Sequence, residues 1–125
     1  MMRDLPPFRA DHVGSILRTA PLKEARAKKA HGDIDAAALK AVEDAEIRKI
    51  IAKQEEVGLQ GVTDGEFRRA WWHYDFLSQL DGVKIVEVDG GIKFAGVTTK
   101  AEAPFVYGKL GSKSHPQIEH FKFLK

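Results

Sequence analysis

The chain has no cysteine among its 125 residues, which excludes disulfide bonds and thiolate metal sites within it. It also lacks any apolar run close to the roughly 18 residues of a membrane-spanning helix. Its first residues, Met1 to Pro7, turn polar and proline-rich at once, unlike a signal peptide. We therefore expect a cytoplasmic protein with no membrane partner.

An excess of charge of one sign is missing as well. Twenty lysines and arginines oppose eighteen aspartates and glutamates, and the two signs are interspersed along the chain, with a net charge of +2. Surfaces that bind nucleic acid carry clustered positive charge. The sequence therefore predicts no nucleic-acid partner.

Enough apolar residues are present for one core. They make up 43% of the chain, and the length suits one domain. A complete small α/β domain is therefore one interpretation of these 125 residues.

Two short segments are predicted to be strands that end in polar groups. Phe8 to Val13 leads into Gly14 and Ser15, and Gly61 to Val62 opens a second segment that ends at Glu66. Helices between the two segments would make the strands parallel. Parallel α/β folds place their chemistry at the carboxyl ends of the strands, so we expect Ser15 and Glu66 at one edge of one sheet.

Two helices are predicted between these segments. The first begins near Pro21 and ends at Gly32, and the second follows Asp35, whose carboxylate can cap the first turn, and ends at Gly58. Helical spacing in the second helix indicates a solvated charged side, which includes Lys40, Glu43 and Asp44. The opposite, core-facing side is formed by Leu39, Val42, Ile47, Ile50, Ile51 and Val57.

The part after Glu66 is predicted to begin and end with helices. Ala70 to Leu80 is typical of a short aromatic helix, and a last helix begins near Pro116. His115 and His120 lack acidic neighbours and are predicted to be surface residues.

A β-hairpin is predicted between these helices, within residues 83–110. Val83 to Val88 and Ile92 to Val97 flank Asp89-Gly90-Gly91, where glycine supplies the positive φ of a tight turn. Phe105 to Tyr107 is a candidate further strand.

The predicted strand ends carry groups that suit an amino acid. Glu66 can pair with an ammonium group. The backbone N–H and hydroxyl of Ser15, with Gly14 allowing close approach, can bind a carboxylate. The alternative for Glu66 is a structural salt bridge to Arg18, Arg68 or Arg69.

Four more residues are candidates for the wall of a binding site. Trp71, Trp72 and His73 can stack on a flat heterocycle such as a pterin, although at least one tryptophan can pack into the core instead. His12 stands two residues before Gly14 and either contacts a ligand or orders the first loop. A lone histidine without a second ligand at suitable spacing does not predict a metal site.

Three motifs follow one another along the chain: Phe8 to Ser15, Val62 to His73, and Leu80-Asp81-Gly82. Together they resemble the catalytic half of cobalamin-independent methionine synthase. They are closer still to its shorter, single-barrel relatives, the 5-methyltetrahydropteroyltriglutamate-homocysteine methyltransferase-related proteins. The resemblance implies an α/β fold, namely the N-terminal portion of a (β/α)₈ TIM barrel with a β-hairpin insertion after the second strand. Because a whole barrel takes about 250 residues, we expect residues 1–125 to be an incomplete, N-terminal part of one.

The resemblance also implies an activity and its residues. The family transfers a methyl group from 5-methyltetrahydrofolate or a related donor to homocysteine or a similar thiol. Val13-Gly14-Ser15 corresponds to a triplet that binds the homocysteine backbone, and Glu66 to a glutamate that binds its amino group. The family's zinc, which activates the thiol, is bound by a His, a Glu and two Cys downstream of the matched region. No catalytic residue and no metal ligand are therefore expected in this chain.

One departure from the family pattern qualifies this picture. Asp64 stands where the long methionine synthases carry a histidine, which places the chain with the shorter relatives and leaves the methyl donor open. A non-catalytic module that binds an amino acid or serves assembly on the same scaffold is the alternative function. The isolated chain is expected to be inactive and to self-associate, because a partial barrel leaves strand edges unpaired.

Overall fold

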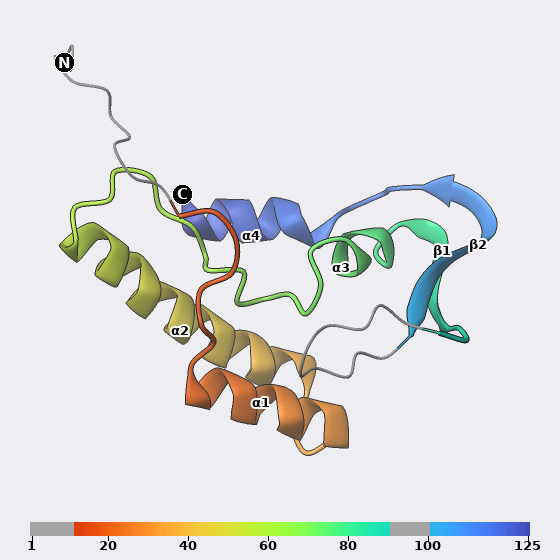
Figure 1. Ribbon diagram of the computed structural model, residues 1–125, viewed down its shortest axis with the longest axis horizontal. Coiled ribbons are helices and arrows are strands. Elements are labelled where there is room, and N and C mark those ends of the chain that lie inside the picture. Colours follow the sequence, from red (N-terminus) through yellow and green to blue (C-terminus); the bar gives the residue numbers. More distant parts are fainter. Residues whose placement is uncertain (1–11, 91–100) are drawn as a thin grey trace, which may run out of the picture. The chain divides into compact units, whose positions relative to one another are not determined.

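The computed structural model describes residues 12–90 and 101–125, which form two compact units divided between Arg68 and Arg69 (Figure 1). The first unit is helical, and the second contains a two-stranded sheet with two short helices. The part of the first predicted strand before His12 lies outside the described residues, as does the predicted strand Ile92 to Val97.

Helix α1, Ala20–His31, opens the first unit. Pro21 lies in its first turn, where a missing N–H is no loss. Gly32 ends it in the left-handed region at φ 84°, and its N–H bonds back to the carbonyls of the last turn. Both predicted ends are confirmed. Leu22 and Ala25 are buried, and α1 lies along α2 (Figure 1).

Helix α2, Ala36–Glu56, is the longest element. Asp35 caps it, with one carboxylate oxygen accepting from the N–H of Ala38 at 2.7 Å. Gly58, at φ 85°, lies where the chain leaves the helix, as predicted. Ile47, on the middle turns, is fully buried. No helix in the described ranges combines the length and apolarity needed to cross a bilayer.

The interior face of α2 is more polar than its apolar pattern predicted. Glu43, predicted on the solvated side, is 8% exposed, and Gln54 is 4% exposed, whereas Val57, predicted for the core, is 64% exposed. The reason is the segment that follows the helix. Arg68 donates to Glu43, and Gln54 bonds to the backbone of Thr63. Polar groups in this segment therefore require polar partners on α2.

The two segments predicted as parallel strands are not strands within the described residues. Residues 12–15 are irregular, and 61–66 run as coil into a turn. One backbone hydrogen bond, from the N–H of Ile16 to the carbonyl of Gly65 at 3.1 Å, joins the two segments. Several other backbone groups of the second segment bond to side chains instead, so no ladder forms. The barrel portion remains a prediction.

The second unit begins with helix α3, Tyr74–Leu77, which is shorter than the predicted helix over residues 70–80. Asp75 explains the difference. Its carboxylate accepts from the N–H of Ala70 at 3.1 Å and of Trp71 at 2.8 Å, which holds these residues in a loop over the helix start.

Strands β1, Asp81–Glu87, and β2, Glu102–Gly111, pair antiparallel. The candidate strand Phe105 to Tyr107 lies within β2. Gly82 has φ 78°, and a Cβ there would lie 2.7 Å from a carbonyl oxygen of β2, so the close approach of the strands requires glycine. The position of this pair as an insertion in a barrel remains a prediction.

Helix α4, Pro116–Leu124, begins where it was predicted. His115, predicted as a surface residue, is partly exposed and also caps this helix. Its Nδ1 accepts from the N–H of Gln117 at 3.3 Å, so Nε2 carries the ring proton and donates to the carbonyl of Phe76 at 3.1 Å. The ring also packs on Phe76, with centroids 4.4 Å apart. The sequence around His115, which lacks an acidic neighbour, did not predict these contacts.

We expect His115→Ala to loosen α4, because it removes the cap and the contact with Phe76 together. Loss of a helix cap costs about 1 kcal/mol. Amide hydrogen exchange of α4 should accelerate, while His115→Asn, which keeps a capping side chain, should restore part of the protection. Unchanged exchange in both variants would show that the cap does not hold the helix.

Arg68, the last residue of the first unit, belongs to a charged cluster. The guanidinium of Arg68, 5% exposed, contacts Glu43 at 3.4 Å and Asp44 at 2.5 Å. Burial raises the pKa of Glu43 above its usual value, although Arg68 and Arg26 act in the opposite sense. Burial also acts to raise the pKa of Asp44, but hydrogen bonds from Lys40 and Arg68 outweigh it and the net shift is downward.

The raised pKa of Glu43 predicts how its contribution to the free energy of unfolding changes with pH. The folded protein holds this proton more tightly than the unfolded chain, so the contribution of Glu43 to stability falls as pH rises above 4.5 toward the folded pKa. Glu43→Gln cannot titrate. The unfolding free energy of the wild type minus that of Glu43→Gln should therefore decline as the pH rises above 4.5 in urea denaturation. A rise of this difference above pH 4.5 would contradict the raised pKa.

Candidate functional site

The predicted site centres on a turn that holds Glu66 in an uncommon backbone conformation. Gly65 and Glu66 have φ of 66° and 60°, and the N–H of Phe67 donates to the carbonyl of Asp64 at 3.3 Å. Positive φ at both central positions is the signature of a type I′ turn. Among the described residues, Glu66 is the one residue other than glycine with positive φ. Such strain costs on the order of 1–3 kcal/mol, so the surroundings must hold it.

Two side chains of the turn bond to its own N–H groups. The Thr63 hydroxyl accepts from the N–H of Gly65 at 3.0 Å, and the Asp64 carboxylate accepts from the N–H of Glu66 at 2.9 Å. Short polar side chains are suited to such local bonds. Asp64 therefore has a structural role directly before Glu66.

Gln54, on the last turn of α2, holds the start of the turn. Its Nε2 donates to the Thr63 carbonyl at 2.8 Å, and its Oε1 accepts from the Thr63 N–H at 3.0 Å. Nε2 also donates to the Ile50 carbonyl at 3.1 Å. The amide exchanges two hydrogen bonds with one residue, as a strand partner does in an antiparallel ladder.

The remaining carbonyls of the turn accept from other parts of the first unit. Arg18 donates to the carbonyl of Glu66 at 3.3 Å, and Arg26 donates to that of Phe67 at 2.6 Å. The N–H of Ile16 donates to the carbonyl of Gly65. Together with the bonds at residues 63 and 64, every carbonyl from 63 to 67 accepts a hydrogen bond.

The second arm of the predicted site runs beside this turn. Val13, Gly14 and Ser15 are exposed, and Gly14 has φ 92°. Ser15 directly precedes Ile16, and Glu66 directly follows Gly65, so both flank the same backbone hydrogen bond. The structure therefore brings Ser15 and Glu66 together without the sheet that was predicted to do so.

Two of the three alternative partners of Glu66, Arg68 and Arg18, have the following contacts. Arg68 pairs with Glu43 and Asp44. Arg18 donates to the backbone carbonyl of Glu66. Both arginines therefore have roles in the structure that do not depend on the Glu66 carboxylate.

The aromatic candidates form a cluster within the second unit. The rings of Trp72 and His73 lie 4.3 Å apart, and those of His73 and Tyr74 lie 3.9 Å apart. Trp72 is 71% exposed and Trp71 is half-buried, so neither tryptophan is a fully buried core residue. In the first unit, His12 is half-buried, and its Nε2 finds no hydrogen-bond partner among the described residues.

The residues present do not fit a zinc ion. The described part of the chain contains no group of three His, Asp or Glu side chains that could hold a metal, and the sequence contains no cysteine.

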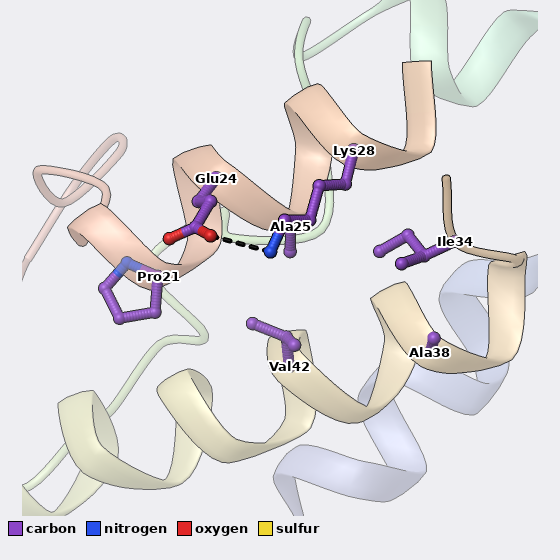
Figure 2. A pocket seen from close by; sticks show the side chains of 7 residues that line it. All are labelled: Pro21, Glu24, Ala25, Lys28, Ile34, Ala38 and Val42. Atoms are coloured by element: carbon purple, nitrogen blue, oxygen red, sulfur yellow. Dashed lines mark ion pairs between the residues drawn. The ribbon is translucent and has the colours of Figure 1, made fainter. Parts of the chain in front are cut away.

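A pocket between α1 and α2 is not the site. It has a volume of about 290 Å³, and Figure 2 shows its largely apolar wall with Glu24 and Lys28 paired at one side. Their 2.7 Å contact leaves the pocket without convergent polar groups. Its lining includes none of the predicted site residues and consists of Pro21, Glu24, Ala25, Lys28, Ile34, Ala38 and Val42.

Sequence reasoning missed Gln54 and Arg26 as supports of the turn, and it named Arg18 as a partner of the Glu66 carboxylate, whereas Arg18 donates to the Glu66 carbonyl. For Gln54 a signal was present, because it follows Ile50 by four residues and Ile47 by seven and so falls on the apolar face of α2. A polar residue at a core position requires a buried partner. Arg26 gave no comparable signal, since arginine on a helix surface is ordinary.

The turn predicts a graded response to alanine at two glycines. Gly58 has φ 85° with no atom within 4 Å of an added Cβ, so Gly58→Ala adds strain alone. At Gly65, φ 66°, the Cβ would also lie 3.0 Å from the Phe67 ring and 3.3 Å from Ile16. Gly65→Ala should therefore destabilise by about 1 kcal/mol or more beyond Gly58→Ala in urea denaturation. Equal effects would show that the turn is not closely packed.

Comparison with known proteins places the chain in a family. Residues 8–122 match the family described as cobalamin-independent synthase, catalytic domain. The uncharacterised Bacillus subtilis proteins YxjH and YxjG are 55% and 51% identical over 94% and 99% of the chain. The chain spans 31% and 33% of their lengths, about a third.

More distant relatives and a solved structure agree. A 5-methyltetrahydropteroyltriglutamate–homocysteine methyltransferase of Thermosynechococcus vestitus is 32% identical over 118 residues, which cover 15% of it. The same number of residues covers 31% of YxjH, so YxjH is about half as long. A Listeria monocytogenes protein solved as a candidate vitamin-B12-independent methionine synthase is 45% identical, with a TM-score of 0.73 over 98% of this chain and 33% of that one. The chain therefore belongs to the cobalamin-independent methionine synthase family, within its catalytic domain.

Proposed function

We propose that the protein containing this chain is a methionine-synthase-like S-methyltransferase. It transfers a methyl group from 5-methyltetrahydrofolate or a related donor to homocysteine or a similar thiol. Family membership supports the reaction class, and relatives of 30–35% identity carry the name 5-methyltetrahydropteroyltriglutamate–homocysteine methyltransferase. Residues 1–125 are proposed to form the N-terminal portion of a TIM barrel. The protein is proposed to act in the cytoplasm on small molecules.

Val13, Gly14, Ser15 and Glu66 are proposed to bind the amino-acid end of the thiol substrate. The observation that carries this proposal is the hydrogen bond between Ile16 and Gly65, which sets Ser15 beside Glu66. Ser15 offers an N–H and a hydroxyl to a carboxylate, and Glu66 offers a negative charge to an ammonium group. Two opposite charges of an α-amino acid then meet two complementary groups on neighbouring arms.

The methyl donor is proposed to meet aromatic surface. Trp72 is 71% exposed and packs against His73, which gives a flat heterocycle a ring to stack on. Trp71 is proposed to complete this wall. His12, in the first unit, is proposed to contact a ligand there. The higher identity to the YxjH type than to the long methyltransferases is the reason to keep related donors within the proposal.

Zinc activation of the thiol is proposed to come from residues outside these 125. The described residues offer no three-ligand group, and the chain has no cysteine. The second candidate function is a non-catalytic amino-acid-binding or assembly module on the same scaffold. A His-x-Cys and a later Cys encoded beyond Lys125 would favour catalysis, and their absence would favour binding alone.

Self-association of the isolated chain is proposed from its exposed apolar side chains. Strand β2 is exposed along most of its length, and α4 exposes two large apolar residues. Exposed apolar surface of this kind promotes contacts between copies. The exposed residues of the two elements are Phe105, Val106, Tyr107, Leu110, Ile118 and Phe121.

The test of this proposal is the charge of Glu66. Glu66→Gln keeps the shape of the side chain but removes the charge that would pair with the ligand ammonium. Loss of a charge-assisted hydrogen bond costs about 1.5–3 kcal/mol, or about tenfold to a hundredfold in affinity. Calorimetric titration of the full-length protein with L-homocysteine and L-methionine should show this loss.

The matched control is Glu56→Gln, at an exposed glutamate near the end of α2 that pairs with Lys53. It should leave both affinities unchanged. Equal affinities for the wild type and Glu66→Gln would remove Glu66 from the site and, with it, the amino-acid grip.

A further inference from the structure

Gln54 lies outside the three sequence motifs that resemble the family. It is nevertheless among the most buried polar residues that the structure describes. It is 4% exposed, and its amide makes three hydrogen bonds. Two of the three go to Thr63, three residues before Glu66. A buried amide with so many bonds to one loop residue fixes the position of that loop.

We propose that Gln54 is a positioning residue for Glu66. Its amide, acting through Thr63, holds the turn in the conformation that offers the Glu66 carboxylate to a ligand ammonium. This inference rests on the proposed function, in which Glu66 binds that ammonium group.

The surroundings of the Gln54 side chain require an amide. Two carbonyls, of Ile50 and Thr63, face Nε2, and one N–H, of Thr63, faces Oε1. A flipped amide or a carboxylate would set oxygen against two carbonyl oxygens, and an aliphatic side chain would leave all three groups without this partner. Few other side chains can serve here.

Thr63 connects Gln54 to Glu66 through the backbone of the turn. The Thr63 hydroxyl bonds to the N–H of Gly65 at 3.0 Å, and the next peptide carries Glu66 at φ 60°. Residues other than glycine prefer negative φ, so this conformation persists only while its neighbours hold it. Removing the Gln54 amide frees Thr63, and the turn can then relax and move the Glu66 side chain.

Loss of the Gln54 amide should affect the binding of only one end of the ligand. The proposed carboxylate grip, Gly14 and Ser15, meets the turn through the hydrogen bond of Ile16 to Gly65. None of the three Gln54 bonds goes to that arm. A fault at Gln54 should therefore weaken recognition of the ammonium group and spare recognition of the rest of the ligand.

A pair of ligands separates these contributions. L-methionine and 4-(methylthio)butanoate differ by the α-ammonium group alone, so the ratio of their dissociation constants reports the Glu66 contact. In calorimetry on the full-length wild type we expect methionine to bind about tenfold to a hundredfold more tightly. Glu66→Gln should collapse this ratio.

Gln54→Leu should collapse the ratio in the same way while leaving the affinity for 4-(methylthio)butanoate within about twofold of the wild type. Thr63→Val keeps the backbone bonds to Gln54 and removes the hydroxyl, and it should also lower the ratio, with Thr63→Ser restoring it. If Gln54→Leu does not fold, the Thr63 pair still tests the link. The control is Gln79→Leu, the same change at an exposed glutamine, which should leave the ratio unchanged.

The outcomes are distinguishable. A wild-type ratio near one would overturn both the role of Glu66 and this inference. A large wild-type ratio that collapses in Glu66→Gln but persists in Gln54→Leu and Thr63→Val would overturn the positioning role alone. Equal loss of affinity for both ligands in Gln54→Leu would show a merely structural residue and would also overturn it.

Discussion

The backbone of Thr63 to Phe67 has no strand to pair with among the described residues, and this constraint shapes the whole first unit. Buried peptide groups must find hydrogen-bond partners. Here helices α1 and α2 supply them through side chains, with Gln54 at the start of the turn and Arg26 at its end. The burial of the Gln54 amide on α2 follows directly from this need.

Magnitudes indicate that these contacts are sufficient. A net hydrogen bond contributes about 1 kcal/mol, and burial of a side chain such as Phe67 contributes about 2–3 kcal/mol. Phe67 is fully buried, and the carbonyls of residues 63–67 are all bonded. The sum exceeds the roughly 1–3 kcal/mol that positive φ costs at Glu66. A strained residue that its neighbours hold so firmly is what a preorganised binding group requires.

The parts of the fold that depend on local chemistry could be predicted from the sequence. Asp35 caps α2, Gly32 ends α1 and α4 begins at Pro116, because caps and breakers act within a few residues. The strand prediction for residues 61–66 failed because a strand depends on neighbours far along the chain. The contacts of His115 could not be predicted for the same reason, since its partner Phe76 lies 39 residues away.

The candidate site divides in the same way. Ser15 and Glu66 could be named from motifs, and the hydrogen bond of Ile16 to Gly65 brings them together. Their support by Gln54 and Arg26 lies outside those motifs. Gln54 could have been noticed as a polar residue on the apolar face of α2, whereas Arg26 left no such signal. Which residues support the turn depends on the three-dimensional structure, whereas the candidate site residues could be named from the sequence.

The most direct test of this account is a crystal structure of the full-length protein with L-methionine bound. We expect the ligand ammonium within hydrogen-bond distance of the Glu66 carboxylate, about 2.7–3.2 Å. Glu66 should keep its positive φ, and Gln54 should still exchange two hydrogen bonds with Thr63. A ligand bound away from Glu66, or a turn at residues 63–67 that rearranges on binding, would contradict it.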